Sequence, residues 1–390
     1  MARKVLFVFN EAYFFYWHRL KLAQAVQTAG YEVHIAAPND HVWAPDGFSV
    51  EVFRDLGFHF HPIPLSRRGT NPFVDAWTLL ALFRLMRALS PDLVHFATIK
   101  PNLYGGIAAR LARVKSVAYS ITGLGQVFIA RGVRAWATRT YVSMLLRVAF
   151  RHPNCRIIFL NPDDRDRLIS LGVADPARSR IISGEGVDLK VHTPREEPSG
   201  VPVVLLCARL IWEKGVGDFV DAARLLRNDG VHARFALVGE TRPANPRSVP
   251  KSTIEGWVKE GVVEWWGYRS DIETVLAEGN VVCLPSKYGE GVPRILQEAA
   301  ASGRAVVATN IPGCRDAVQD GVTGFLIPAG NVEALADRLR SLITDIPLRR
   351  KLGHAGRRRA EAAFGQGEVV HATLRVYQET GWRAEMTATP

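Results

Sequence analysis

Short apolar runs alternate with longer amphipathic stretches along the first half of this chain. Five runs predict strands: Lys4–Asn10, Glu32–Ala37, Asp92–Phe96, Ser116–Ile121 and Arg156–Leu160. The amphipathic stretches predict helices at His18–Thr28, Phe48–Leu56, Pro72–Leu89, Leu103–Ala112 and Trp136–Phe150. The segment His59–Ile63 is predicted to be extended. This alternation favours a parallel sheet covered by helices on both faces.

The second half repeats the alternation after a polar run rich in breakers, Thr193–Gly200, which is typical of a linker. Its predicted strands are Val203–Ala208, Ala233–Val238, Val262–Trp265, Val281–Leu284, Ala305–Ala308 and Phe325–Ile327. Helices are predicted at Val332–Thr344, with Asn331 as N-cap, and at Gly367–Trp382. We therefore predict an α/β protein with two Rossmann-like domains, 1–190 and 191–365, and an interdomain cleft suited to a ligand. The C-terminal helix and tail, 366–390, are expected to pack back toward the first domain.

Composition narrows the class of protein. The 390 residues carry a net charge of +11, and the four cysteines are far apart, which indicates reduced thiols rather than disulfides or a zinc site. The N-terminal apolar run is too short for a signal peptide, and no stretch is long enough to span a bilayer. We expect a cytoplasmic protein.

The positive charge is concentrated in one window. No acidic residue lies between Asp92 and Asp163, whereas the window holds Lys100, Arg110, Arg113, Lys115, Arg131, Arg134, Arg139, Arg147, Arg151 and Arg156. A basic region without nearby acidic residues favours binding to an anionic partner, either nucleic acid or a membrane. Within the window, Trp136–Phe150 interleaves arginines with large apolar residues, as interfacial helices do. We therefore predict peripheral binding to the inner face of the cell membrane, and no nucleic-acid partner.

Two glutamates mark the strongest candidate site. Glu290 lies between two glycines directly after the strand Val281–Leu284, and Glu298 lies on the helix that Pro293 opens. A helix N-terminus offers free backbone N–H groups to an anion, and carboxylates accept hydrogen bonds from sugar hydroxyls. Together, the helix N-terminus and the two carboxylates predict a pocket for a sugar nucleotide.

Two cations accompany these glutamates. Arg209 comes at the carboxyl end of the first strand of the second domain, and Lys214 comes just before a helix, followed by Gly215. Ligands bind at strand carboxyl ends in open parallel sheets, and a diphosphate accepts both an arginine fork and a lysine point charge.

Together these motifs resemble those of the retaining, GT-B-fold glycosyltransferases of family 4. The resemblance rests on Arg209…Lys214-Gly215, Glu290-x7-Glu298, Pro312-Gly313, Asp320–Gly324 and Gly186-Val187-Asp188. Further stretches are similar to those of bacterial members that act on undecaprenyl-diphosphate-linked sugars: Thr98–Asn102, Ile121–Gly125, Asn161–Asp164 and Asn245–Ser248. The resemblance implies a UDP-sugar donor, a lipid-linked saccharide acceptor, and no cofactor or metal. We expect the donor sugar to be of the N-acetylhexosamine type.

The resemblance also implies roles for individual residues of the second domain. Glu298 would hold the donor ribose, and Glu290, with the backbone of Gly291 and Val292, would hold the donor sugar. Arg209 and Lys214 would bind the diphosphate. Tyr268, which follows Gly267 at a strand end, would lie against the nucleobase, with plain core packing as the alternative.

In the first domain the family often carries two histidines after the fourth strand. This chain has His95 at the first of those positions and Ala97 at the second. The polar contact to the transferred sugar is then expected from His95, Lys100 or a backbone group, and Lys100 is also placed to bind acceptor phosphate.

Two other functions remain open from the sequence. One is a GT-B-fold UDP-sugar 2-epimerase, which would share the diphosphate-binding cations. The other is a non-enzymatic protein that binds a membrane or nucleic acid through the basic window.

The pattern Asp164-Arg165-Asp166 formally matches a metal-binding motif, but its place after Asn161-Pro162 indicates the start of a helix.

Overall fold

The computed structural model describes residues 3–39, 48–66, 71–129, 132–242 and 245–383. The chain folds into two compact units, the first comprising 1–185 and 369–390 and the second comprising 186–368. Arg131 of the basic window and residues 384–390 of the expected tail lie outside the described residues.

The first unit is built on a parallel seven-stranded sheet of order β3-β2-β1-β4-β5-β6-β7. Its strands are β1 (Arg3–Val8), β2 (Tyr31–Ala37), β3 (His59–Pro62), β4 (Leu93–Ala97), β5 (Ser116–Ile121), β6 (Cys155–Phe159) and β7 (Ser179–Ile181). Its helices are α1 (Ala12–Thr28), α2 (Glu51–Asp55), α3 (Pro72–Leu89), η1 (Pro101–Gly105), α4 (Gly106–Ala112), α5 (Gly125–Ile129), α6 (Val133–Phe150), α7 (Pro162–Ser170) and η2 (Pro176–Arg178).

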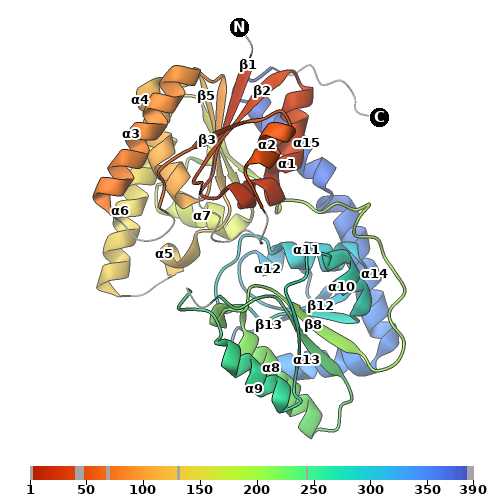
Figure 1. Ribbon diagram of the computed structural model, residues 1–390. Coiled ribbons are helices and arrows are strands. Elements are labelled where there is room, and N and C mark those ends of the chain that lie inside the picture. Colours follow the sequence, from red (N-terminus) through yellow and green to blue (C-terminus); the bar gives the residue numbers. More distant parts are fainter. Residues whose placement is uncertain (1–2, 40–47, 67–70, 130–131, 243–244, 384–390) are drawn as a thin grey trace. The chain divides into compact units, whose positions relative to one another are not determined.

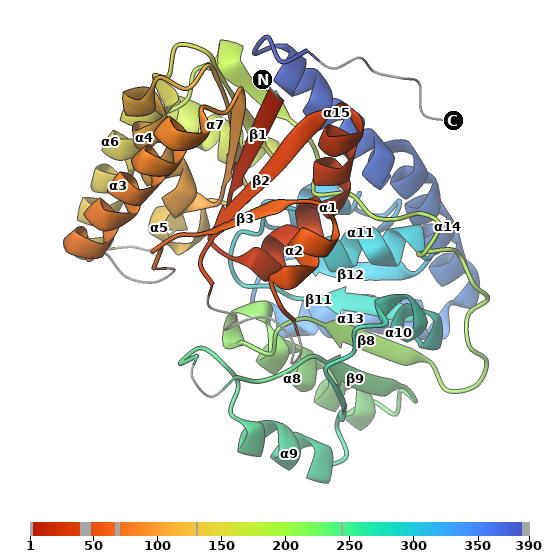
Figure 2. The ribbon, with the colours of Figure 1, turned by 45° about the horizontal axis from the view of Figure 1, so that its top comes forward.

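Helices cover both faces of this sheet. Side chains of a strand point alternately to the two faces, so the apolar strands make both faces hydrophobic and each face needs a layer of helices. Side chains of α3, α4 and α6 share one core cluster, and those of α1, α2 and the C-terminal helix α15 (Gln366–Gln378) share another. Figures 1 and 2 show these two groups of helices on opposite sides of the strands.

The second unit holds a parallel six-stranded sheet of order β10-β9-β8-β11-β12-β13. Its strands are β8 (Val203–Cys207), β9 (Arg234–Val238), β10 (Glu264–Gly267), β11 (Val281–Leu284), β12 (Ala305–Thr309) and β13 (Gly324–Ile327). Its helices are η3 (Trp212–Lys214), α8 (Val216–Asn228), α9 (Lys251–Lys259), α10 (Ile272–Glu278), α11 (Arg294–Ala301), α12 (Cys314–Ala317), α13 (Val332–Thr344) and α14 (Ile346–Ala363). The expectation of two Rossmann-like parallel-sheet units is confirmed.

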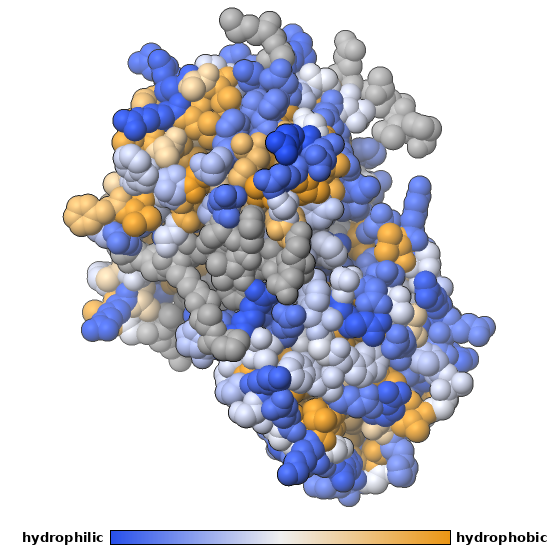
Figure 3. Space-filling model, in the orientation of Figure 1, coloured by the Kyte–Doolittle hydropathy of each residue, from blue (hydrophilic) through white to orange (hydrophobic). Residues whose placement is uncertain are grey.

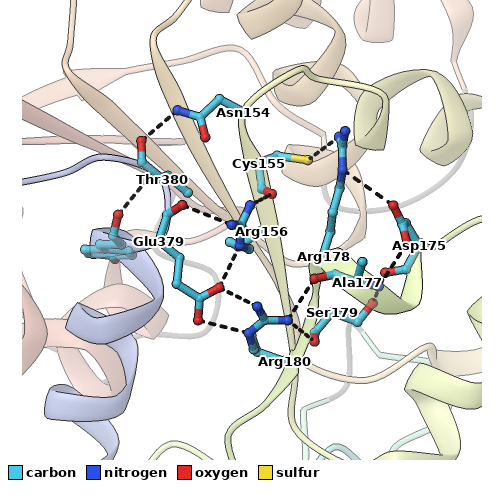
Figure 4. Close-up of polar contacts among 11 residues, drawn as sticks. Asn154, Cys155, Arg156, Asp175, Ala177, Arg178, Ser179, Arg180, Glu379 and Thr380 are labelled. Carbon is cyan, nitrogen blue, oxygen red and sulfur yellow. Dashed lines mark hydrogen bonds and ion pairs between the residues drawn. The ribbon is translucent and has the colours of Figure 1, made fainter.

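The C-terminal helix returns the chain to the first unit. Glu379, just after the helix, accepts hydrogen bonds from Arg156 of β6 (2.7 Å) and from Arg180 of the neighbouring strand β7 (2.9 Å). Figure 4 shows the Glu379 carboxylate between these two arginines. Tyr377 and Trp382 belong to the apolar core on the same face of the sheet as α1 and α2. Ion pairing and apolar burial together attach α15 to this sheet.

Some elements differ from the sequence-based expectations. Helix α1 begins at Ala12, earlier than predicted, and packs Phe15 into the core. The predicted helix Leu103–Ala112 begins with a π-helical segment at Pro101. Strand β7 and helix α14 were not predicted. The first is only three residues long, and the second has the arginine-rich sequence IPLRRKLGHAGRRRAEAA, which hides its apolar stripe.

Candidate active site

Two neighbouring strands of the second unit bring the predicted donor residues to one sheet edge. Strands β8 and β11 pair in parallel, so their carboxyl ends lie side by side. Arg209 comes two residues after β8, and Lys214 ends the short helix η3 that follows. Glu290 lies in the loop between β11 and α11, and Glu298 lies on α11. All four residues therefore belong to the connections that leave this edge.

Lys214 and Glu290 form a direct ion pair. The Lys214 Nζ lies 2.6 Å from Glu290 Oε1, and each side chain is only 12% exposed. Ser286 Oγ donates a second hydrogen bond to the same carboxylate oxygen at 2.8 Å. Because water is largely excluded, this pair is screened less than a surface pair. The site therefore holds a cation and a carboxylate in hydrogen-bond contact. A cation suits the phosphate of a phosphorylated sugar, and a carboxylate suits its hydroxyl groups.

Two glycines hold the Glu290 loop in place. Gly215 has φ +74°, and a Cβ there would lie 2.0 Å from the Pro285 carbonyl oxygen. Gly313 has φ +79°, and a Cβ there would lie 1.6 Å from the Gly291 oxygen. Both positions therefore require glycine. The loop is fixed by the turn before α8 on one side and by the turn after β12 on the other.

Glu298 is buried in a polar contact with its own helix. It is 5% exposed, and its Oε1 accepts a hydrogen bond from Arg294 Nε at 2.7 Å. His192 Nε2 lies 3.7 Å from the same oxygen. Burial lowers the pKa of His192, while the nearby Glu298 carboxylate acts in the opposite direction. Sequence reasoning missed His192, which follows the Gly186-Val187-Asp188 motif. Its only signal was this position beside a motif already noted.

The remaining predicted donor contacts lie at or near the same edge. Arg209 is exposed, and Val292 is 7% exposed, so Val292 offers its backbone rather than its side chain. Gly291 contributes the carbonyl against which Gly313 packs. Tyr268 follows β10, the outermost strand, and is 44% exposed. That exposure argues against the alternative that Tyr268 is a plain core residue.

In the first unit, the structure does not support the predicted contact of His95 with the transferred sugar. His95 is fully buried on β4. Its Nδ1 lies 2.5 Å from Tyr377 Oη of α15, and its Nε2 lies 2.7 Å from Ser120 Oγ. Burial holds the pKa of this imidazole well below its usual value. With both nitrogens occupied inside the core, the neutral ring attaches α15 to the sheet.

Lys100 lies just after β4, as expected, but it is paired. Its Nζ is 2.9 Å from Asp75 Oδ1, and Tyr104 Oη donates to the other Asp75 oxygen at 2.7 Å. Asp75 is a buried residue of α3. Burial, followed by the neighbouring Asp75 carboxylate, raises the pKa of Tyr104. Lys100 is thus held in a fixed position, and the Asp75 carboxylate of α3 balances its charge.

A second acidic residue between two glycines was missed. Glu185 lies between Gly184 and Gly186, a local pattern like that of Glu290 between Gly289 and Gly291. It is 8% exposed, with Oε2 2.5 Å from His18 Nδ1 and Oε1 3.2 Å from Arg19. His18 and Arg19 come from α1, so the contact brings together segments that are distant in the sequence. The repeated pattern was the signal that could have identified it.

Comparison with known families identifies this arrangement. Residues 4–151 match the family described as "Glycosyl transferase 4-like", and residues 201–345 match "Glycosyl transferases group 1". The two matches cover both units and include Lys100, Arg209, Lys214, Glu290 and Glu298. The chain belongs to glycosyltransferase family 4. It is a glycosyltransferase with the GT-B fold. Its matching family models and the curated relatives given below are glycosyltransferases, which disfavours the epimerase and the non-enzymatic alternatives.

Two curated relatives of this glycosyltransferase are named for transfer to lipid-linked sugars. It is 29% identical, over 86% of its length and 88% of the relative's, to a Campylobacter jejuni N,N'-diacetylbacillosaminyl-diphospho-undecaprenol alpha-1,3-N-acetylgalactosaminyltransferase. It is 26% identical, over 73% of its length and 74% of the relative's, to an Escherichia coli UDP-Gal:alpha-D-GlcNAc-diphosphoundecaprenol alpha-1,3-galactosyltransferase.

Solved structures support the same fold for the glycosyltransferase. A glycosyltransferase from Rickettsia africae superposes with a TM-score of 0.78 at 18% identity, covering 98% of this chain and all of that one. Anabaena HepE in complex with UDP gives a TM-score of 0.75 at 18% identity, covering 96% and 99%. Among the described residues, no helix is both long and apolar enough to cross a bilayer.

Proposed function

We propose that this enzyme transfers an N-acetylhexosamine-type sugar from a UDP-sugar to a polyprenyl-diphosphate-linked saccharide in the synthesis of a surface polysaccharide or glycan. The observation that carries the proposal is the contact of Lys214 with Glu290 at the carboxyl edge of β8 and β11, with Glu298 on the next helix. The two named relatives support the choice of acceptor and donor, since both act on diphosphoundecaprenol-linked sugars and one transfers N-acetylgalactosamine.

The donor roles follow from the charges at this edge. Glu298 accepts hydrogen bonds from the ribose hydroxyls, and Glu290, with the backbone of Gly291 and Val292, binds hydroxyls of the sugar. A lysine ammonium has three N–H donors, so Lys214 can keep Glu290 and also donate to a phosphate oxygen. Arg209 binds the diphosphate as well. The exposed ring of Tyr268 stacks on the nucleobase.

Transfer proceeds with retention of configuration at the anomeric carbon. An acceptor hydroxyl oxygen attacks that carbon from the face that the diphosphate leaves, the bond from carbon to phosphate oxygen breaks, and the leaving phosphate takes the hydroxyl proton. Negative charge grows on the diphosphate as this bond breaks. Lys214 and Arg209 stabilise that charge, which is often the largest single contribution to catalysis. The proposal requires no metal ion.

The acceptor side belongs to the first unit. Lys100, held by Asp75, is the proposed contact for an acceptor phosphate. His18 and Arg19, held by Glu185 in the same unit, are proposed contacts for the acceptor saccharide. Both groups pair a cation with a buried carboxylate, so each cation keeps a fixed position without a ligand.

A lipid-linked acceptor requires the enzyme to reach a membrane. Helices α3 and α6 expose large apolar side chains, among them Phe73 (86% exposed), Trp77, Val133, Trp136 (59%) and Met144. Figure 3 shows hydrophobic residues at the surface over α3. Helix α6 also lies in the window that contains no acidic residue. Basic and apolar groups on neighbouring helices suit the anionic inner face of a cell membrane.

The test of the proposed reaction is a donor screen with and without acceptor. Purified enzyme is incubated with UDP-GalNAc, UDP-GlcNAc, UDP-galactose or UDP-glucose and an undecaprenyl-diphosphate-linked N-acetylated sugar. We expect UDP release and an extended lipid-linked product with an N-acetylated donor, and neither when acceptor is omitted. Turnover of UDP-GlcNAc without acceptor would favour an epimerase, and the absence of product with every donor would contradict the proposal.

The membrane contact is tested separately by sedimentation with lipid vesicles. Wild-type enzyme should bind vesicles that contain anionic lipid, less so as salt rises, since the Debye length falls from about 10 Å at 0.1 M to about 3 Å at 1 M. Trp136→Ser should weaken binding, whereas Val258→Ser, a control at an exposed position of α9, should not. Equal binding to neutral vesicles at all salt concentrations would rule out the electrostatic part.

A further inference from the structure

Three histidines and one glutamate gather on the outer two strands of the first sheet. Strand β3 is at the edge of the sheet (Figure 2), and β2 is its one neighbour among the described strands. The register places His34 of β2 beside His59 of β3. Glu32 and His34 alternate with buried Val33 and Ile35, so they share one face of β2, and His59 and His61 likewise share one face of β3.

The side chains of this cluster converge. The His34 ring stacks on both His59 and His61, with ring centroids 4.7 Å and 5.2 Å apart. Ligand atoms of Glu32, His34 and His59 lie within 4.8 Å of one another. A tetrahedral zinc site with bonds of about 2.0–2.1 Å places its ligand atoms about 3.3–3.4 Å apart. The partly exposed Glu32 and the exposed His59 side chain can close that difference by small rotations.

A buried nitrogen of this cluster has no hydrogen-bond partner among the described residues. His34 is 5% exposed, and its Nδ1 pairs with His61 Nε2 at 3.0 Å. Its Nε2 is buried with no hydrogen-bond partner, and the nearest carboxylate oxygen, on Glu32, is 3.6 Å away. That distance is too long for a hydrogen bond. When His34 carries its proton on Nδ1, the Nε2 lone pair faces the Glu32 carboxylate, which is unfavourable unless a cation lies between them.

We propose that Glu32, His34 and His59 bind a first-row divalent cation of the Zn²⁺ type at this sheet edge. Imidazole nitrogen and carboxylate oxygen are ligands that zinc accepts, and three protein ligands leave a fourth position for water. His61 accepts the Nδ1 hydrogen of His34 and so orients the liganding ring, as the outer partners of metal-bound histidines do. The cation would fasten edge strand β3 to β2.

This site differs from the proposed transfer site in position and in role. His34 is in the middle of β2, and His59 is the first residue of β3, whereas the proposed acceptor contact Lys100 follows the carboxyl end of β4. No metal site was expected from the sequence, and this cluster is not visible there, because His34 and His59 are 25 residues apart and only the strand register brings them together. The inference does not depend on the proposed transfer reaction.

The first measurement is metal stoichiometry on the full chain without an affinity tag. Enzyme treated with chelator and then dialysed is titrated with Zn²⁺ by calorimetry, and with Co²⁺ while its visible absorption is recorded. Wild-type enzyme and His232→Gln, a control at an exposed histidine of the second unit, should each bind close to one equivalent. His59→Gln should reduce the affinity at least ten-fold and abolish the Co²⁺ absorption bands. Because His59 is exposed, this variant leaves the fold intact.

Two further results complete the test. His61→Gln should weaken Zn²⁺ binding by about 10- to 100-fold, as expected for an outer partner. Zn²⁺ should also slow amide hydrogen exchange in the 59–62 segment of wild-type enzyme but not of His59→Gln. Binding that is equal in wild type and His59→Gln, or exchange in β3 that zinc does not change, would overturn the proposal.

Discussion

At the scale of single residues, the ion pair between Lys214 and Glu290 is the central contact of the proposed donor site. Each side chain is mostly buried, so neither charge is well hydrated without the other. Ser286 gives Glu290 a second partner, whereas no other acidic contact of Lys214 is described. The pair therefore keeps a cation in place at low cost until a diphosphate, which offers more negative charge, reaches it.

Replacing that cation should affect the chemistry more than the fold. Lys214→Ala should lower kcat by about 10²- to 10³-fold, since it removes one group that stabilises charge on the leaving diphosphate. Lys259→Ala, at an exposed position of α9, is the matched control and should keep its rate. Steady-state kinetics with the preferred donor measure both. A Lys214→Ala enzyme with the wild-type kcat would show that this cation does not act on the leaving group.

At the scale of elements, the C-terminal helix depends on a few long-range contacts. Tyr377 of α15 is fully buried and hydrogen-bonds His95 of β4, and Glu379 pairs with Arg156 and Arg180 (Figure 4). The Glu379 contacts are partly exposed and contribute little each. The Tyr377 contact is buried, so its loss leaves a polar nitrogen without a partner inside the core.

Removing the hydroxyl group of Tyr377 should therefore destabilise the first unit. Tyr377→Phe should lower the free energy of unfolding by about 1–3 kcal/mol, the cost of leaving the buried His95 Nδ1 unpaired. The exposed His371→Ala on the same helix should change it much less. Urea unfolding of both variants gives the comparison. No loss in Tyr377→Phe would mean that the hydrogen bond contributes nothing to the attachment of α15.

The sequence was most informative where a feature is local. Strands such as Val281–Leu284 are continuous apolar runs, and the loop and helix that carry Glu290 and Glu298 follow directly, so the strand–loop–helix unit could be predicted. Contacts between segments that are distant in the sequence could not be predicted in this way. The pairing of Lys214 with Glu290 depends on β8 lying next to β11, and that of His18 with Glu185 on tertiary packing. His95 was one of three candidates for the sugar contact, and its burial could not be foreseen because it depends on Tyr377 of α15, 282 residues later.

At the scale of the whole molecule, buried neutral histidines should make the fold sensitive to acid. Burial lowers the pKa of His95, His152 and His192 in the folded protein. Below the ordinary value of about 6.5, the unfolded chain takes up protons that the folded chain does not. The free energy of unfolding is therefore highest above pH 6.5 and falls as the pH drops below it.

The histidines change the free energy of unfolding in a different pH range from the carboxylates. Carboxylates with lowered pKa, such as Glu264 and Glu379, reduce the stability only below about pH 4.5. The midpoint of urea unfolding should decrease between pH 7.5 and pH 5.5. His232→Gln, which alters an exposed histidine, should follow the same curve. A midpoint that is constant over this range would show that these imidazoles titrate as they do in the unfolded chain.

The most direct test of the central claim is calorimetric titration of UDP into the enzyme and two charge-neutral variants. Glu298→Gln removes the proposed ribose contact on α11, and Glu333→Gln removes an exposed carboxylate in the first turn of α13. UDP should bind wild type and Glu333→Gln equally and Glu298→Gln about 10- to 100-fold more weakly, the loss expected for hydrogen bonds to a charged group. Equal affinity of all three proteins, or no binding of UDP at all, would contradict the assignment of the donor site to this edge of the second sheet.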